Sequence, residues 1–168
     1  MISSEWFPIV KRTAQHGLDE ASLSQDKFYS WLAIWALDVV CESKEFMNAV
    51  PPGDKTEAGD VLWGIAASSM LLGITQEDIT ENFIETPAES YSDLIDCAAS
   101  YADHAKKVSR DQRLLSNELP KLKVLLIDVF SCLASMIDLN QALEAVNKKL
   151  LQRYPNGYTA NASINRVV

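Results

Sequence analysis

Four carboxylates stand in two short phrases on either side of a proline-rich turn. Glu42 and Glu45 form an E-x-x-E phrase and Glu57 and Asp60 form an E-x-x-D phrase, within the segment CESKEFMNAVPPGDKTEAGD. Carboxylate oxygens bind hard divalent cations, Mg²⁺ first and Mn²⁺ second, and Mg²⁺ commonly completes its shell with water and substrate phosphates. If the two phrases face each other, they predict one end of a metal and phosphate site.

Two helices joined by a short turn would bring these phrases together. Apolar residues at helical spacing predict one helix over residues 25–49, which Pro51 and Pro52 end, and a second over residues 55–72. Gly73 then supplies the residue type that accepts the left-handed conformation after a helix. Because the connection is short, we expect the helices to pack antiparallel, with all four acids at one end of the hairpin.

The stripe that carries the first pair of acids also carries tryptophans. Steps of four and three residues from position 31 to position 49 keep side chains on one helix face. They are Trp31, Trp35, Asp38, Glu42, Glu45 and Ala49. The neighbouring stripe is apolar too, so we expect the acids to point inward or to lie at the mouth of a cleft. On the second helix Glu57 and Asp60 share a stripe with Gly64, which permits close approach of a neighbour or ligand.

Each pair of acids also has an interpretation without a metal. Asp54 and Glu57 have the D-x-x-E spacing of a capping box, so Glu57 by itself is as typical of a cap as of a ligand. Glu42 and Glu45, next to Lys44, are by themselves typical of a solvated helix face. An uncompensated buried carboxylate costs on the order of several kcal/mol, which a divalent cation removes. The two pairs together, with the turn between them, favour the metal site.

The rest of the chain predicts an all-α protein with a single domain, residues 1–168. Further helices are expected over residues 5–15, 76–84, 89–110, 119–137 and 140–153. Thr75 with Asp78 is typical of a helix cap, and Pro120 suits a first helical turn, where a missing N–H costs nothing. Apolar residues are 48% of the 168, enough to form one core.

The net charge, the cysteines and the hydropathy of the chain limit which cellular compartment and which partners we expect. The formal charge of −8 argues against nucleic-acid binding, which needs a basic face. Three cysteines without a C-x-x-C pair predict buried free thiols in a reducing cytoplasm. The most apolar segment, residues 28–41, is shorter than the roughly 20 residues of a membrane helix. We therefore expect a cytoplasmic protein with no nucleic-acid and no membrane partner.

Other catalytic patterns are weak. His16 and His104 lie far apart and neither completes an E-x-x-H pair, which disfavours a di-iron carboxylate bundle. The sequence has no G-x-S-x-G and no glycine-rich phosphate loop. The acids around the proline-rich turn are therefore the strongest candidates for chemistry.

Two segments together resemble a known family. The E-x-x-E and E-x-x-D phrases, with the 11-residue spacer between them and the following VLWGIAASSMLLGI, closely resemble the MazG-like all-α nucleoside triphosphate pyrophosphohydrolases. The ending KLLQRYPNGYTANASINR is similar to the K-L-x-x-R-Y-P ending of that family. The match covers about half of the chain. Cys41 stands where the family often has a first glutamate, and residues 85–119 have no clear counterpart in its shortest members.

The resemblance implies a helical bundle built around the acidic hairpin and a hydrolase that cleaves a nucleoside triphosphate into a monophosphate and pyrophosphate. It implies that four acids hold Mg²⁺, with Mn²⁺ as the alternative ion, and that Glu42 or Glu45 also orients or deprotonates the attacking water. The implied metal ligands are Glu42, Glu45, Glu57 and Asp60. The implied substrate contacts are Lys55, Lys149, Arg153, Tyr158, Asn165 and Arg166. Trp31, Trp35 and Trp63 are candidates for stacking on the base, although each also fits a core position.

Two other functions remain as alternatives. A non-catalytic helical bundle could keep the hairpin for assembly or nucleotide sensing, and a dUTPase-like enzyme of the same superfamily would narrow the substrate. A hairpin with apolar residues on more than one stripe cannot cover itself. Because members of the family are commonly dimers or tetramers, we expect a homodimer or a higher homo-oligomer.

Overall fold

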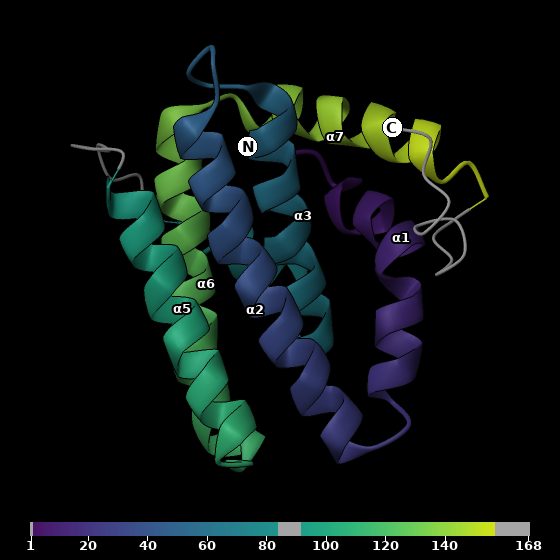
Figure 1. The fold of residues 1–168 in the computed structure, drawn as a ribbon, viewed down its shortest axis with the longest axis vertical. Helices are drawn as coiled ribbons and strands as arrows, with labels where there is room; N and C mark the ends of the chain where they lie inside the picture. Colours follow the sequence, from purple (N-terminus) through teal and green to yellow (C-terminus); the bar gives the residue numbers. More distant parts are fainter. Residues whose placement is uncertain (1, 84–91, 157–168) are drawn as a thin grey trace.

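A computed structural model describes residues 2–83 and 92–156 of the chain (Figure 1). Over these residues all regular secondary structure is helical, which confirms the predicted all-α class. The helices are α1 Trp6–Ala21, α2 Gln25–Asn48, α3 Lys55–Leu72, α4 Gln76–Thr80, α5 Ser92–Arg110, α6 Leu115–Met136 and α7 Leu139–Arg153. Within the described part of the chain, none of them has both the length and the apolar character needed to cross a membrane.

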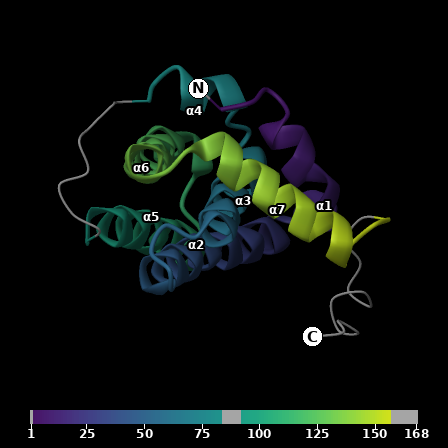
Figure 2. The same ribbon diagram turned by 90° about the horizontal axis from the view of Figure 1, so that it is seen from above.

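Four long helices form a ring of neighbours. α2 packs against α3 and α5, and α6 packs against the same two helices and closes the ring. Figure 1 shows these four helices side by side, with α2 and α3 running in opposite directions. α1 lies against α2 and α3, and α4 against α6. Seen from above in Figure 2, α7 crosses the end of the bundle where α2 stops and α3 starts, and it packs mainly on α3.

One hydrophobic cluster contains side chains from each of these helices. Trp6 of α1 is completely buried, and its indole Nε1 donates a hydrogen bond of 3.2 Å to the carbonyl oxygen of Leu62 in α3. The same indole stacks on Phe130 of α6 with ring centroids 5.2 Å apart. Trp6 therefore fixes the helix outside the ring to two helices within it.

The helix ends follow the capping residues of the sequence. Ser24 accepts a hydrogen bond from the Lys27 backbone N–H at the start of α2, and Thr75 with Asp78 forms the predicted capping box of α4. Gly73 ends α3 with a φ of 71°, in the left-handed region where glycine is favoured. These local signals fix the ends of the hairpin that carries the acids.

The first helix is longer than predicted. We expected residues 5–15, but α1 continues to Ala21 because Gly17 is a packing position and not a helix terminator. A Cβ at Gly17 would lie 2.6 Å from the Trp35 ring and 3.1 Å from the Trp31 ring. The missing side chain lets two indoles lie against the helix, and that contact outweighs the low helix propensity of glycine.

The expected helix over residues 119–137 begins four residues earlier, at Leu115, and ends at Met136. Pro120 is therefore inside the helix and not in its first turn, which corrects that prediction. Leu115 and Leu119 both pack on the core, and this burial offsets the backbone hydrogen bond that proline cannot donate. The short helix α4 ends at Thr80, before the predicted position 84, which lies outside the described residues.

The cysteines are less buried than predicted. Cys41 is exposed, and Cys97 and Cys132 are partly buried. The prediction of three buried thiols is therefore wrong, because the Cys41 side chain is open to solvent and the other two are only partly covered. The sulfur atoms of Cys97 and Cys132 are 3.5 Å apart, at the contact between α5 and α6.

Candidate metal and phosphate site

Three carboxylates converge where α2 ends and α3 begins. Glu42 lies in the last two turns of α2, and Glu57 and Asp60 lie in the first two turns of α3. One carboxylate oxygen from each lies within 4.8 Å of the others, and all three side chains are half-buried. Oxygens at this separation from two rigid helices could share one hard cation.

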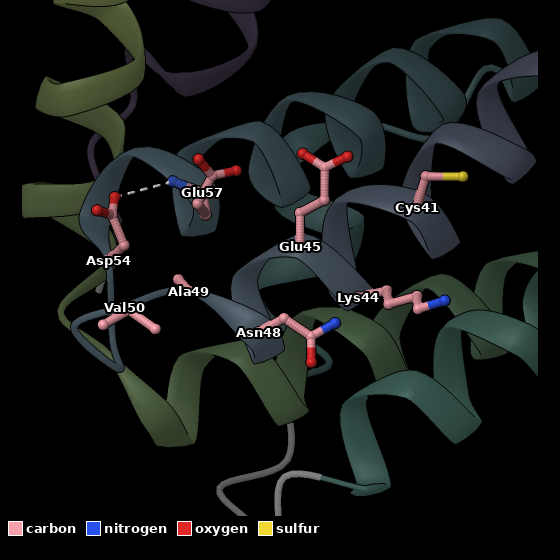
Figure 3. A pocket seen from close by; sticks show the side chains of 8 residues that line it. All are labelled: Cys41, Lys44, Glu45, Asn48, Ala49, Val50, Asp54 and Glu57. Atoms are coloured by element: carbon pink, nitrogen blue, oxygen red, sulfur yellow. Dashed lines mark hydrogen bonds between the residues drawn. The ribbon is translucent and has the colours of Figure 1, made fainter.

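Glu45 is outside this group. It lies one turn beyond Glu42, and its side chain is exposed. Figure 3 shows the carboxylates of Glu45 and Glu57 on neighbouring helices, directed to the same side of a hollow that both residues line. The structure therefore brings three of the four predicted ligands together, with Glu45 at the rim.

Asp54 is the cap of α3. Its carboxylate accepts hydrogen bonds from the backbone N–H of Thr56, at 2.7 Å, and from the backbone N–H of Glu57, at 3.3 Å. Figure 3 shows the second of these bonds. Among the residues that the structure describes, the Glu57 carboxylate itself has no hydrogen-bond partner. The capping role thus belongs to Asp54, and the Glu57 oxygens remain available to a ligand.

Lys149 of α7 forms an ion pair with Asp60. The lysine Nζ donates a hydrogen bond to Asp60 Oδ2, and the two side chains are only 20% and 15% exposed. Gly59 lets α7 come close enough to α3 for this pair to form. A Cβ at Gly59 would lie 2.6 Å from the Ala142 carbonyl oxygen of α7. The absence of a side chain at position 59 therefore sets how closely the two helices approach.

The site has more negative charge than its neighbours neutralise. Burial raises the pKa of Glu42 to about 7, and repulsion from Asp60 and Glu45 adds to that effect, against the attraction of Lys149. Burial also raises the pKa of Asp60, although Lys149 and Arg153 act in the opposite direction. A cluster that resists ionisation in this way is one that an added cation would stabilise.

Three hollows surround the carboxylates. The acidic hollow, about 500 Å³, is lined by Cys41, Lys44, Glu45, Asp54 and Glu57 among others. The basic hollow, about 550 Å³, is lined by Thr56, Glu57, Lys148, Lys149, Gln152 and Arg153 among others. The aromatic hollow, about 400 Å³, is lined by Trp31, Trp35, Asp38, Glu42, Trp63 and Arg153 among others. The acids thus border a region with a cationic side and an aromatic side.

The tryptophans of the aromatic hollow are held in place at their polar ends. Trp31 Nε1 donates to Glu20 at 3.3 Å, and Trp63 Nε1 donates to the Thr13 hydroxyl at 2.8 Å. The ring centroids of Trp31 and Trp35 are 5.3 Å apart, and those of Trp35 and Trp63 are 6.2 Å apart. Apolar ring surface therefore borders the hollow, while both N–H groups already have partners.

The remaining predicted contacts differ in their positions. Arg153, at the end of α7, is exposed and lines both the basic and the aromatic hollow. Lys55 is also exposed, but it lines none of the three hollows. The predicted contacts in the tail lie outside the described residues; they are Tyr158, Asn165 and Arg166.

Two residues that the sequence analysis named neither as metal ligands nor as substrate contacts contribute to the site. Asp38 lines the aromatic hollow, and its signal was available, because it lies four residues before Glu42 on the same helical stripe. Gly59 adjoins Asp60, but nothing in the local pattern distinguishes it from an ordinary helical glycine. Its importance depends on α7, which begins 80 residues further along the chain.

No protein-family model, no curated protein and no solved structure matches this chain. The fold and the site define a helical bundle with three clustered carboxylates, a lysine–aspartate pair and an adjoining aromatic hollow.

Proposed function

We propose that the chain is a MazG-like, Mg²⁺-dependent nucleoside triphosphate pyrophosphohydrolase with a role in nucleotide-pool house-cleaning. The carrying observation is the convergence of Glu42, Glu57 and Asp60 beside the basic and aromatic hollows. A triphosphate needs cations around its phosphates and an apolar surface for its base. The hollows offer both within reach of the same carboxylates.

The donor set fits a hard divalent ion. The ligands Glu42, Glu57 and Asp60 offer only oxygens, and Lys149 compensates only part of their charge. Glu45 is close enough to raise the pKa of Glu42, and its exposed side chain could turn toward the bound ion. Bound Mg²⁺, or Mn²⁺ in its place, would neutralise phosphate charge and acidify water.

The proposed role of Lys149 is to hold phosphate oxygens. Without a ligand, its ammonium group pairs with Asp60. A cation bound at Asp60 would weaken that pair and release Lys149 toward the basic hollow, where Arg153 supplies a second positive charge. Both side chains come from α7, so a phosphate chain would lie between α7 and the start of α3.

Glu42 and Glu45 are the proposed groups for water. Glu42 faces the other two acids, whereas Glu45 lies one turn away at an open rim. Either carboxylate can orient a water for attack on the phosphorus and accept its proton. The base would lie in the aromatic hollow against the rings of Trp31 and Trp63.

One observation favours a non-catalytic bundle as the second candidate. The Lys149 and Asp60 side chains are 20% and 15% exposed, and a partly buried structural ion pair needs no metal. In that case Glu42 and Glu57 would be tolerated acids at a helix junction. A dUTPase-like enzyme of the same superfamily would instead retain the metal site and accept mainly uracil nucleotides.

A substrate panel separates these candidates. Standard and damaged nucleoside triphosphates are incubated with the protein, with Mg²⁺ or with EDTA, and the products are identified by phosphorus NMR. We expect monophosphate and pyrophosphate, formed only with the metal. Release of orthophosphate would contradict the proposed cleavage position, activity restricted to dUTP would favour the dUTPase-like enzyme, and no product from any substrate would favour the non-catalytic bundle.

A further inference from the structure

Asp38 is an acid that the proposed hydrolysis does not use. It lies on α2 between Trp35 and Glu42, and it lines the aromatic hollow among indole rings. Its side chain is half-buried, and burial raises the pKa of its carboxyl group. A carboxylate in such surroundings loses hydration, and that loss calls for a compensating partner.

No such partner is present in the described residues. Three neighbouring polar side chains of the hollow are already paired with other groups. Trp63 Nε1 donates to Thr13, whose hydroxyl donates to the Val10 carbonyl oxygen. Trp31 Nε1 donates to Glu20, outside the hollow. Asp38 accepts no hydrogen bond from residues 2–83 or 92–156, so its two oxygens are acceptors available to a ligand in the hollow.

The position of Asp38 relative to the phosphate site suits a base-reading group. Asp38 and Glu42 are four residues apart on one helix face, which corresponds to roughly 6 Å along the axis. Arg153 lies at the same hollow and at the basic hollow. A nucleotide with its phosphates at Glu42 and Arg153 would therefore direct its base toward the tryptophans and Asp38.

We propose that Asp38 is a specificity-determining residue that selects guanine nucleotides by accepting two parallel hydrogen bonds from N1–H and the N2 amino group. This inference rests on the proposed function and names the substrate class of the same site. Two adjacent N–H donors match the two oxygens of a carboxylate. Uracil and thymine present one N–H between two carbonyl oxygens, which the carboxylate repels, and adenine and cytosine place a ring acceptor beside the amino group.

The test compares dGTP with dITP, whose base keeps N1–H but lacks the amino group. We expect the wild type to prefer dGTP in kcat/KM by about tenfold or more, because a hydrogen bond to a charged group is worth roughly that factor. Asp38→Asn should reduce this preference to about threefold or less while changing kcat/KM for dUTP little. Asp26→Asn, an exposed acid of the same helix, should leave the preference unchanged.

Two kinetic results would overturn the inference. One is a dGTP preference that survives in Asp38→Asn, and the other is an equal loss for every base, which would mean a merely structural role. Binding without turnover separates this inference from the proposed function. Tryptophan fluorescence is titrated with dGMP and dIMP in the presence of Mg²⁺. Discrimination by the wild type and its loss in Asp38→Asn support the base-reading role even if no triphosphate is hydrolysed, and equal affinities in the wild type contradict it.

Discussion

Burial and neighbouring charges bring the pKa of Glu42 close to neutral pH. Its pKa is raised to about 7 by burial and by the charges of Asp60 and Glu45. Lys149 lowers this pKa but does not restore it to the ordinary range. At neutral pH the metal-free protein therefore holds a partly protonated Glu42, and a bound cation would compete with that proton.

The raised pKa of Glu42 predicts a pH-dependent stability. Because the folded state keeps a proton that the unfolded chain releases, the contribution of Glu42 is full below about pH 4.5 and is lost as the pH rises to about 7. In EDTA, Glu42→Gln should match the wild type near pH 4.5 and melt about 3 °C higher, or more, at pH 8. The measurement is thermal unfolding by circular dichroism across this range.

Mg²⁺ provides the control for this prediction. Added Mg²⁺ should raise the melting temperature of the wild type at pH 8 more than that of Glu42→Gln, because a ligand stabilises the state that binds it. Parallel curves of melting temperature against pH for the two proteins would contradict the raised pKa of Glu42 in the folded state.

The packing of α7 on α3 holds the positively charged side chains of the site, Lys149 and Arg153, beside the acids. A side chain at position 59 would disturb this packing, since an added Cβ would lie 2.6 Å from both the Ala142 carbonyl oxygen and Val146 Cβ. Gly59→Ala should lower the free energy of unfolding by about 1–3 kcal/mol and separate Lys149 from Asp60. Urea denaturation measures the loss of stability.

Gly64→Ala is the matched variant on the same helix. Its Cβ would meet the Val39 Cγ2 atom, the end of a side chain, at 3.0 Å. Val39 must move by a few tenths of an ångström to accept this Cβ, and the roughly 1 kcal/mol of helix propensity that alanine gains over glycine offsets that cost. We expect Gly64→Ala to stay near wild-type stability; a Gly59 variant of equal stability would show that α7 is not held as closely as described.

The elements also show what the sequence could and could not predict. The ends of α2 and α3 were predictable, because Ser24, Asp54 and Gly73 act through their own neighbours in the chain. The length of α1 and the start of α6 were not, because Gly17 and Pro120 are tolerated only through packing against distant helices. Local chemistry determined the caps, while tertiary contacts decided where glycine and proline were accepted.

The same distinction holds in the site. Periodicity placed Glu42, Glu57 and Asp60 at one helix junction, because a short turn leaves two helices few ways to pack. The pairing of Lys149 with Asp60 needed the path of α7, which no local pattern specifies. The sequence could therefore identify the acids, but not that Lys149 forms an ion pair with Asp60.

At the scale of the whole molecule, large apolar side chains of α2 remain exposed. Ile34 is 46% exposed and Leu37 is 59% exposed. We expect this chain to form a homodimer or a higher homo-oligomer, which would cover such residues. Light scattering at micromolar concentration should give at least twice the chain mass of 18.7 kDa. A mass equal to one chain would reject this prediction.

The central claim is that the clustered acids hold the metal for triphosphate hydrolysis, and one comparison of two variants tests it. Asp60→Asn removes an anionic oxygen from the cluster, whereas Asp54→Asn keeps an acceptor that can cap α3. With a triphosphate that the wild type hydrolyses and with saturating Mg²⁺, Asp60→Asn should lose at least about a hundredfold in kcat/KM, or roughly 2.7 kcal/mol. Asp54→Asn should keep nearly all of its activity. Near-wild-type hydrolysis by Asp60→Asn would contradict the assignment of the metal site.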